Sequence, residues 1–203
     1  MRWGLSISLS EELADPKVLA DVAVIAEEAG WDGVFVWDHL WNRTLAPFAD
    51  PFVTLAAAAI ATERIKVGPL VTALPRRRPQ LVAQSTASLD LLSGGRMVLG
   101  LGLGVDRHGE FSAFDEPAAD DRARARALDE GIEMLKPMLA GEPVAGADGR
   151  ITTLTGVQQP RVPIWIAGTA RYTAGPRRVH RHALEGLALV GAAHQIHLRE
   201  VDA

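Results

Sequence analysis

The chain of 203 residues contains no cysteine, which excludes disulfide bonds and metal sites built on thiolates. Long hydrophobic runs are also absent: stretches such as residues 55–61 fall far short of the ~20 residues that a membrane helix needs. The first residues lack a basic segment followed by an apolar core, so we predict no signal peptide. We therefore expect a cytoplasmic protein that has no membrane partner.

An excess of charge of one sign is missing as well. The formal net charge is −4 and the two signs are interspersed, which argues against nucleic acid as a partner. The histidines lack the grouping that a metal site needs, so we predict no metal. With 48% hydrophobic residues the chain can bury a core, and we expect residues 1–203 to form a single domain.

The most unusual stretch is the apolar run from Met97 to Val105, which has glycine at alternate positions 100, 102 and 104. Its length and its flanking turn residues predict a buried strand. Glycine weakens a strand unless a close neighbour needs the space of the missing side chain. That neighbour is either a ligand lying on the backbone or another strand in a crowded sheet, and the run alone does not decide between them.

Short apolar segments and helical patterns alternate along the whole chain. Asp15-Pro16 and Asp50-Pro51 predict helix starts, because Asp caps free N–H groups and Pro suits the first helical position. Pro69 predicts an irregular third strand, and Asp148-Gly149 predicts the turn of a hairpin. Strands are expected at residues 2–9, 33–38, 65–74, 97–105, 162–167 and 187–191, and further helices at 79–92, 121–139 and 176–182.

Six strand-then-helix alternations predict an α/β fold with a parallel sheet. A β/α barrel needs eight strands and about 250 residues, so the pattern also allows a doubly wound sheet. Four segments, in this order and at these separations, resemble the bacterial luciferase-like monooxygenase superfamily, which includes oxidoreductases dependent on coenzyme F420. They are Gly30-Trp-Asp-Gly-Val-Phe-Val-Trp-Asp-His-Leu40, Thr62-Glu-Arg-Ile-Lys-Val-Gly-Pro-Leu-Val-Thr72, Leu89-Asp-Leu-Leu-Ser-Gly-Gly-Arg96 and Pro163-Ile-Trp-Ile-Ala-Gly168.

The resemblance implies a (β/α)8 TIM-barrel type of fold, here incomplete with about six of the eight β/α units. The missing C-terminal units would leave two unpaired strand edges, through which two copies could form a homodimer. The resemblance also implies FMN or coenzyme F420 at the C-terminal mouth of the barrel, and an oxidoreductase acting on a small organic substrate. With FMN the reaction would use O₂, and with F420 it would be a hydride transfer. The alternative is a non-catalytic or defective flavin-binding partial barrel.

Asp38 and His39 are the candidate catalytic residues, because the family keeps an acid–histidine pair near the flavin ring. Imidazole transfers protons near neutral pH, and the carboxylate could fix its tautomer. The alternative is a histidine that only binds a loop. Relatives that oxidise sugar phosphates place a Glu directly after the glycine strand, where this chain has Val105 and then Asp106. This departure puts that type of dehydrogenase in doubt, and we assign residues 106–110 no role.

The resemblance also suggests cofactor-binding positions. Thr72 ends the third strand, where the family has a bulge, often with a non-proline cis bond, behind the cofactor ring. Arg76–Arg78 could meet the cofactor phosphate or the acidic tail of F420, although we expect at least two of the three to be solvated. The expected cofactor-binding residues are Thr72, Gly102 and Gly104 beside the ring, and Gly168, Thr169 and Ala170 at the phosphate.

Overall fold

The computed structural model describes residues 2–41, 47–116, 120–146, 149–168, 174–182, 184, 186–189 and 195–200. The strands are β1 (Arg2–Ile7), β2 (Gly33–Val36), β3 (Lys66–Pro69), β4 (Thr72–Ala73), β5 (Leu99–Gly102), β6 (Val144–Gly146), β7 (Gly149–Ile151), β8 (Ile164–Gly168), β9 (Gly186–Leu189) and β10 (Gln195–Glu200). The helices are α1 (Pro16–Glu28), α2 (Pro51–Ala61), α3 (Pro79–Ser93), α4 (Asp121–Leu139) and α5 (Ala174–His182), with short 3-10 turns η1 (Glu11–Ala14), η2 (Leu74–Arg76) and η3 (Ser112–Phe114).

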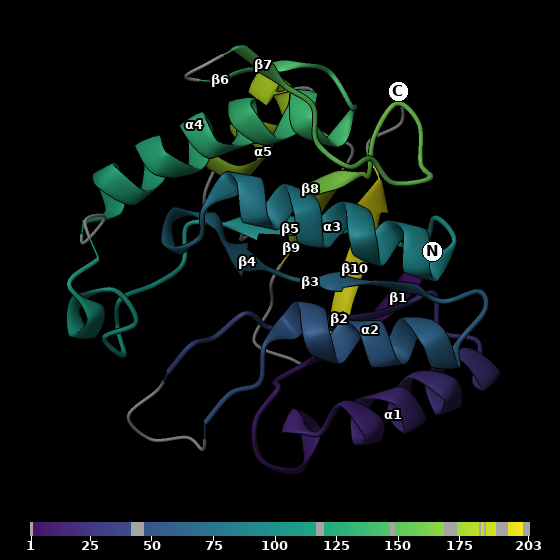
Figure 1. Cartoon of the computed structure of the whole chain (residues 1–203). Coiled ribbons are helices and arrows are strands. Elements are labelled where there is room, and N and C mark those ends of the chain that lie inside the picture. The colour runs from purple at the N-terminus through teal and green to yellow at the C-terminus, as the bar shows by residue number, and fades with distance from the viewer. Residues whose placement is uncertain are drawn as a thin grey trace.

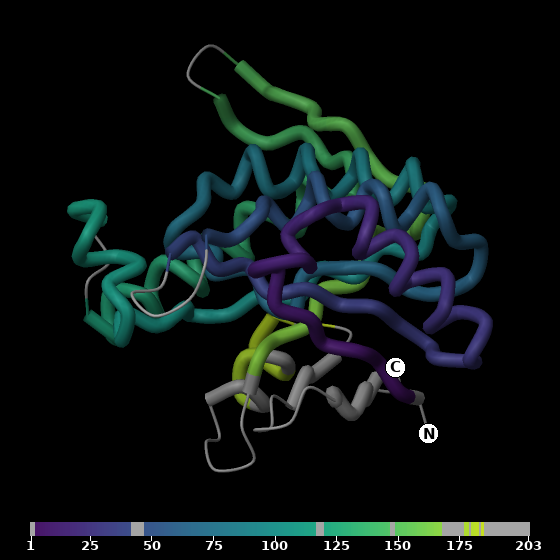
Figure 2. Tube along the Cα trace, turned by 90° about the horizontal axis from the view of Figure 1, so that it is seen from below, coloured from purple at the N-terminus to yellow at the C-terminus, as the bar shows by residue number. Residues whose placement is uncertain are grey.

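The helix starts follow the predicted chemistry. The Asp15 carboxylate accepts a hydrogen bond from the Lys17 N–H, and the Asp50 carboxylate accepts from the N–H groups of Phe52 and Val53. The predicted range of α4 is confirmed, as is the hairpin, in which β6 pairs antiparallel with β7. Figure 1 shows α1 to α4 side by side in chain order, and Figure 2 shows the β6–β7 hairpin projecting from this helical layer.

The strands other than β6 and β7 form a ring. Strands β3, β2 and β1 pair in parallel, as do β9, β8, β5 and β4. Val67 of β3 also pairs with Met97, just before β5, which joins the two sets on one side. On the other side β10 lies antiparallel between β1 and β9. The fold is therefore a small β/α barrel, in which the described strands occupy six parallel positions.

The expected unpaired edges are thus wrong for the described strands. The pairing of β10 on both sides closes the ring where two β/α units were thought to be missing. The signal was present, because Ile196 and Leu198 alternate with polar residues in residues 195–200, a strand pattern that went unrecognised. Edge-to-edge pairing of two copies consequently has no free strand among those described.

The inside of the barrel is filled by large side chains from alternate strand positions. Phe35, Leu70, Val98 and Trp165 are buried together, with the rings of Phe35 and Trp165 6.0 Å apart. Their strand neighbours, such as Leu99 and Ile166, point the other way and pack in the layer between strands and helices. Among the side chains that the structure describes, these four fill the interior between β2, β3, β5 and β8, so we look for a ligand site at the end of the barrel.

The glycines of β5 make this packing possible. A Cβ on Gly100 would lie 2.2 Å from the Leu70 side chain, and a Cβ on Gly102 would lie 2.7 Å from that of Val71. Both neighbours belong to the irregular third strand position, in which the Leu70–Val71 peptide bond is cis and lies between β3, which pairs with β2, and β4, which pairs with β5. The predicted irregularity is confirmed, and the crowded-strand explanation of the glycines is the one that the contacts support.

One arginine ties the helical layer to the barrel. The Arg96 guanidinium donates hydrogen bonds to the carbonyl groups of Ala59 and Thr62 at the C-terminal end of α2 and to that of Ile65, just before β3, and its Nε donates to the Ser93 carbonyl. A helix end leaves such carbonyl groups without partners, and a buried acceptor that loses its donor is costly.

We expect Arg96→Ala to lower the free energy of unfolding by about 3 kcal/mol, because several hydrogen bonds to a charged donor are lost together. Urea unfolding of both proteins measures this difference. Arg64→Ala is the control: this side chain is 71% exposed and pairs with Glu27 at 3.9 Å, so its loss should cost less than about 0.5 kcal/mol. Equal losses for the two variants would contradict this explanation.

Candidate functional site

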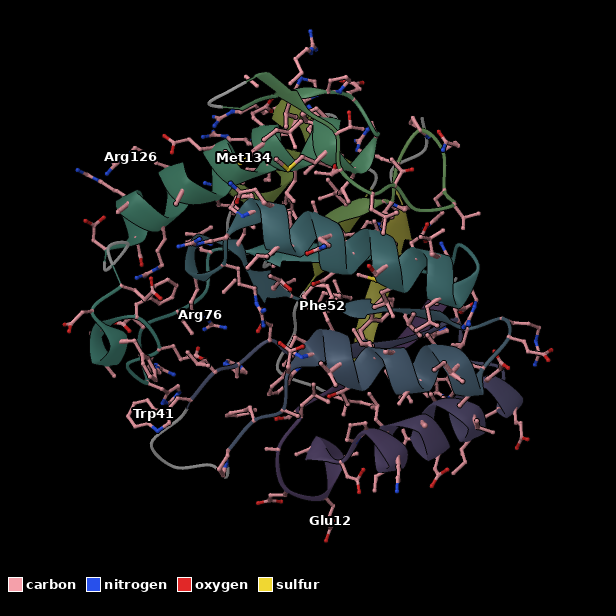
Figure 3. The ribbon with its side chains drawn as sticks, viewed as in Figure 1. Glu12, Trp41, Phe52, Arg76, Arg126 and Met134 are labelled. Atoms are coloured by element: carbon pink, nitrogen blue, oxygen red, sulfur yellow. The ribbon has the colours of Figure 1, made fainter. Side chains whose placement is uncertain are left out.

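Three strand ends meet at the C-terminal end of the barrel. Asp38 and His39 follow β2, Arg76 and Arg77 follow β4 through η2, and Glu110 lies in the loop after β5. Figure 3 shows Arg76 and Trp41 on the left side of the molecule, where these segments come together. The carboxyl ends of parallel strands are where barrel enzymes carry their active sites, so this cluster is the candidate site.

His39 is held by Glu110. Its Nδ1 lies 3.0 Å from Glu110 Oε2, and Glu110 Oε1 accepts a hydrogen bond of 2.7 Å from the Leu40 N–H. Burial raises the pKa of the Glu110 carboxyl, but the hydrogen bonds from His39 and Leu40 and the charge of Arg76 outweigh it and lower this pKa below its usual value. An ionised carboxylate can only accept, so Nδ1 carries a proton and Nε2 is the nitrogen left for chemistry.

Asp38 binds arginines instead of the imidazole. Arg77 donates two hydrogen bonds of 2.7 Å to the two Asp38 oxygens, and Arg76 Nη2 lies 2.5 Å from the Asp38 backbone carbonyl. The expectation that Asp38 fixes the tautomer of His39 is therefore wrong, because its carboxylate is occupied. Asp38 is bound by Arg77 at both carboxylate oxygens and is only 5% exposed, so its carboxylate faces arginines and not the imidazole.

The expectation that at least two of Arg76–Arg78 are solvated is wrong, because Arg78 is exposed but Arg76 and Arg77 are not. The side chain of Arg76 is 5% exposed and that of Arg77 29%, and both are paired with carboxylates. Asp38 and Asp50 together raise the pKa of the Arg77 guanidinium above its usual value, although burial acts to lower it. Asp50 also caps α2, so Arg77 links the start of that helix to the strand that carries the histidine. Arg76 and Arg77 are held by carboxylates from other segments, and a run of three arginines in the sequence does not predict such pairing.

Aromatic rings surround the cluster. Trp37 meets His39 edge to face with ring centres 5.7 Å apart, while its Nε1 donates to Ser6 Oγ. Phe111, fully buried, is near two cations: the guanidinium groups of Arg76 and Arg124 are 5.9 Å and 5.0 Å from its ring centre. These contacts lower the local polarity and hold the loop after β5 against the strand ends.

The imidazole of His39 is held at one ring nitrogen and open at the other. Its side chain is 28% exposed, its Nδ1 is engaged by Glu110, and Nε2 has no hydrogen-bond partner among the described residues. A proton-transfer group beside a cofactor needs this arrangement, with one nitrogen anchored and the other free.

The other predicted cofactor residues give a mixed picture. Thr72 is opposite Leu101 in the parallel ladder and so shares its outward face, and its buried hydroxyl has no hydrogen-bond partner among the described side chains. A role for this hydroxyl at the mouth is not supported. At Gly104 a Cβ would lie 3.0 Å from Phe111, so this position also serves packing. The backbone of Gly168 ends β8, whereas Thr169 and Ala170 lie outside the described residues.

Glu110 is the residue that sequence reasoning missed. The family resemblance predicts a functional Glu directly after the glycine strand, and this chain has Val105 at that position. The loop carries the carboxylate five residues further on, and the fold brings it back to the histidine. The available signal was its position, since Glu110 immediately precedes the large apolar Phe111 in an otherwise polar loop.

A family model described as luciferase-like monooxygenase matches residues 3–195, almost the whole chain. The chain belongs to the luciferase-like monooxygenase family. The F420-dependent glucose-6-phosphate dehydrogenase of Beutenbergia cavernae is 36% identical over 175 residues, which cover 81% of this chain and 51% of that protein. This member of the family spans about half the length of the curated relatives it matches.

Solved structures confirm the barrel type of fold for this luciferase-like chain. The monooxygenase RslO1 from Streptomyces bottropensis matches with a TM-score of 0.75 and 24% identity, covering 92% of this chain and 59% of that one. The oxygenating constituent of 3,6-diketocamphane monooxygenase from Pseudomonas putida, solved in complex with FMN, matches with a TM-score of 0.74 and 18% identity, covering 91% and 56%. Among the described helices, none combines the length and the apolar character that crossing a membrane requires.

Proposed function

We propose that this luciferase-like chain binds coenzyme F420 at the C-terminal mouth of its barrel and takes part in hydride transfer with a small organic hydroxyl compound. The observation that carries the proposal is His39, partly exposed, anchored through Nδ1 by buried Glu110 and open at Nε2. The relative of 36% identity is named as F420-dependent, whereas the likeness to the FMN complex, at 18% identity, supports the fold alone. F420 is therefore preferred to FMN.

The bound deazaflavin would supply a ring position that takes up a hydride. The residues of this chain would handle the proton: Nε2 of His39 would accept it from the substrate hydroxyl as the hydroxyl compound is oxidised to a carbonyl compound. Glu110 then faces an imidazolium instead of an imidazole, and its negative charge stabilises that state. The buried guanidinium of Arg76, bound to the Asp38 carbonyl, holds the strand end that carries His39.

Anaerobic titration of the full chain with F420 and, separately, with FMN tests the proposal. We expect the absorbance spectrum of F420 to change on binding with a micromolar Kd, and FMN to bind at least about tenfold more weakly, a difference of about 1.4 kcal/mol. Incubation with F420 and a panel of sugar phosphates and secondary alcohols should then bleach the oxidised cofactor.

Each outcome decides between the candidates. Preferred binding of FMN, with oxygen uptake once it is reduced, would favour the monooxygenase form of the reaction. Binding of F420 without bleaching by any member of the panel would favour a passive, cofactor-binding barrel. No binding to either cofactor would reject the proposed function.

A further inference from the structure

Arg76 occupies the point where the three strand ends of the site converge. Its Nη2 lies 2.5 Å from the Asp38 carbonyl, in the segment after β2, and its Nη1 lies 3.1 Å from Glu110 Oε1, in the loop after β5. The side chain itself comes from η2, after β4, and is 5% exposed. One buried guanidinium therefore holds together the backbone that carries His39 and the carboxylate that binds His39.

The contact with Glu110 is electrostatic. Nη1 of Arg76 makes no directed hydrogen bond, although it is within ion-pair distance of Oε1. Glu110 is 2% exposed, and a carboxylate so deeply buried stays ionised only if nearby donors and cations compensate its charge. Arg76 supplies the nearest permanent positive charge, whereas His39 is neutral in the state that accepts a proton.

The ionisation of Glu110 decides the tautomer of its partner. As an ionised acceptor, Glu110 requires a proton on Nδ1 of His39, which leaves Nε2 free to accept. As a neutral acid, Glu110 could donate its own proton to Nδ1, which would move the imidazole proton to Nε2 and remove the base from the mouth. The charge beside Glu110 thus selects which form of His39 the site presents.

We infer that Arg76 is a positioning residue: by holding Glu110 and the Asp38 carbonyl, it fixes His39 with Nδ1 protonated and Nε2 open to the barrel mouth. This inference rests on the proposed function in one respect: the proposed reaction is what gives the free Nε2 its task, which is to accept a proton from the substrate. The neighbouring Arg77 provides the comparison, because its recorded hydrogen bonds go to Asp38 and Asp50.

Nitrogen-15 NMR of the full chain, labelled at histidine and free of cofactor, reads the tautomer directly from the two ring-nitrogen shifts. The spectrum of His39→Gln assigns the His39 signals. In the unaltered protein we expect neutral His39 to show a protonated Nδ1 and a bare Nε2. In Arg76→Gln we expect a mixture of tautomers in which the Nε2-protonated form is at least half of the total.

Two further variants make the test specific. Arg77→Gln removes a neighbouring arginine with no recorded contact to Glu110, and it should leave the tautomer of His39 unchanged. Arg76→Lys keeps a cation but cannot span both partners, so a partial shift of the tautomer is expected. If Arg76→Gln does not fold, as judged by circular dichroism, Arg76→Lys provides the test.

The inference is overturned if folded Arg76→Gln, or Arg76→Lys in its place, keeps the tautomer of the unaltered protein. It is equally overturned if Arg77→Gln shifts the tautomer as much as Arg76→Gln does, because general loosening would then explain both. Since no cofactor is present in this experiment, its result is independent of whether F420 binds, and failure of either proposal can be recognised separately.

Discussion

Asp38→Asn should lower the free energy of unfolding by about 3 kcal/mol, the largest effect on stability that we expect from a single change at the site. The substitution keeps the size of the side chain and removes its charge. Arg76, 5% exposed, and Arg77 then lose the carboxylate that they share. A broken buried pair typically costs about 3–5 kcal/mol, and the partial exposure of Arg77 places this one at the lower end.

Urea unfolding monitored by circular dichroism measures this loss, with Asp21→Asn on the exposed face of α1 as the matched control. That variant should stay within about 0.5 kcal/mol of the unaltered protein. The double variant Asp38→Asn/Arg77→Gln should lose less than the sum of the two single variants, because the second change removes a cation that the first leaves uncompensated. A loss below about 1 kcal/mol for Asp38→Asn would show that the arginines find other partners.

Local features of the sequence predicted much of this fold. Asp-Pro pairs set the starts of α1 and α2, and hydrophobic periodicity gave the range of α4, because these signals act within a few residues. A non-proline cis bond in the third strand was suggested by the family resemblance alone, and the structure places it at Leu70–Val71. The alternation in residues 195–200 indicates a strand, but its antiparallel pairing with β1 and β9 depends on long-range contacts that a local pattern does not give.

The site was less predictable than the fold, because the hydrogen-bond partners of its polar residues come from segments that are far apart in the sequence. His39 was identified from the motif at the end of β2, but the choice of Glu110 as its partner required the loop after β5 to fold back. Glu110, and not Asp38, binds the imidazole. Asp38 binds Arg77, and Arg76 pairs with Glu110, although Asp38 was expected to contact His39 and the arginines were expected to be solvated. Burial and charge compensation acted together here, and neither can be read from spacing along the chain.

His39→Gln should lower turnover with F420 about 100-fold while changing the Kd for the cofactor less than about threefold. Glutamine retains a side-chain amide that can bind Glu110, so the loop after β5 keeps its anchor, but no group remains at Nε2 to accept a proton. Loss of a general base commonly costs a factor of about 10²–10⁴. His39→Ala should lose at least as much turnover, because it also releases Glu110 from its partner.

Steady-state bleaching of F420 with a substrate found in the panel measures turnover, and the absorbance titration measures affinity. His180→Gln, on the exposed side of α5, is the control and should match the unaltered protein in both. Parallel losses of affinity and turnover would make His39 a contact for the cofactor instead of a proton acceptor. Unchanged turnover in His39→Gln would remove the histidine from the mechanism and leave Glu110 as the group to test next.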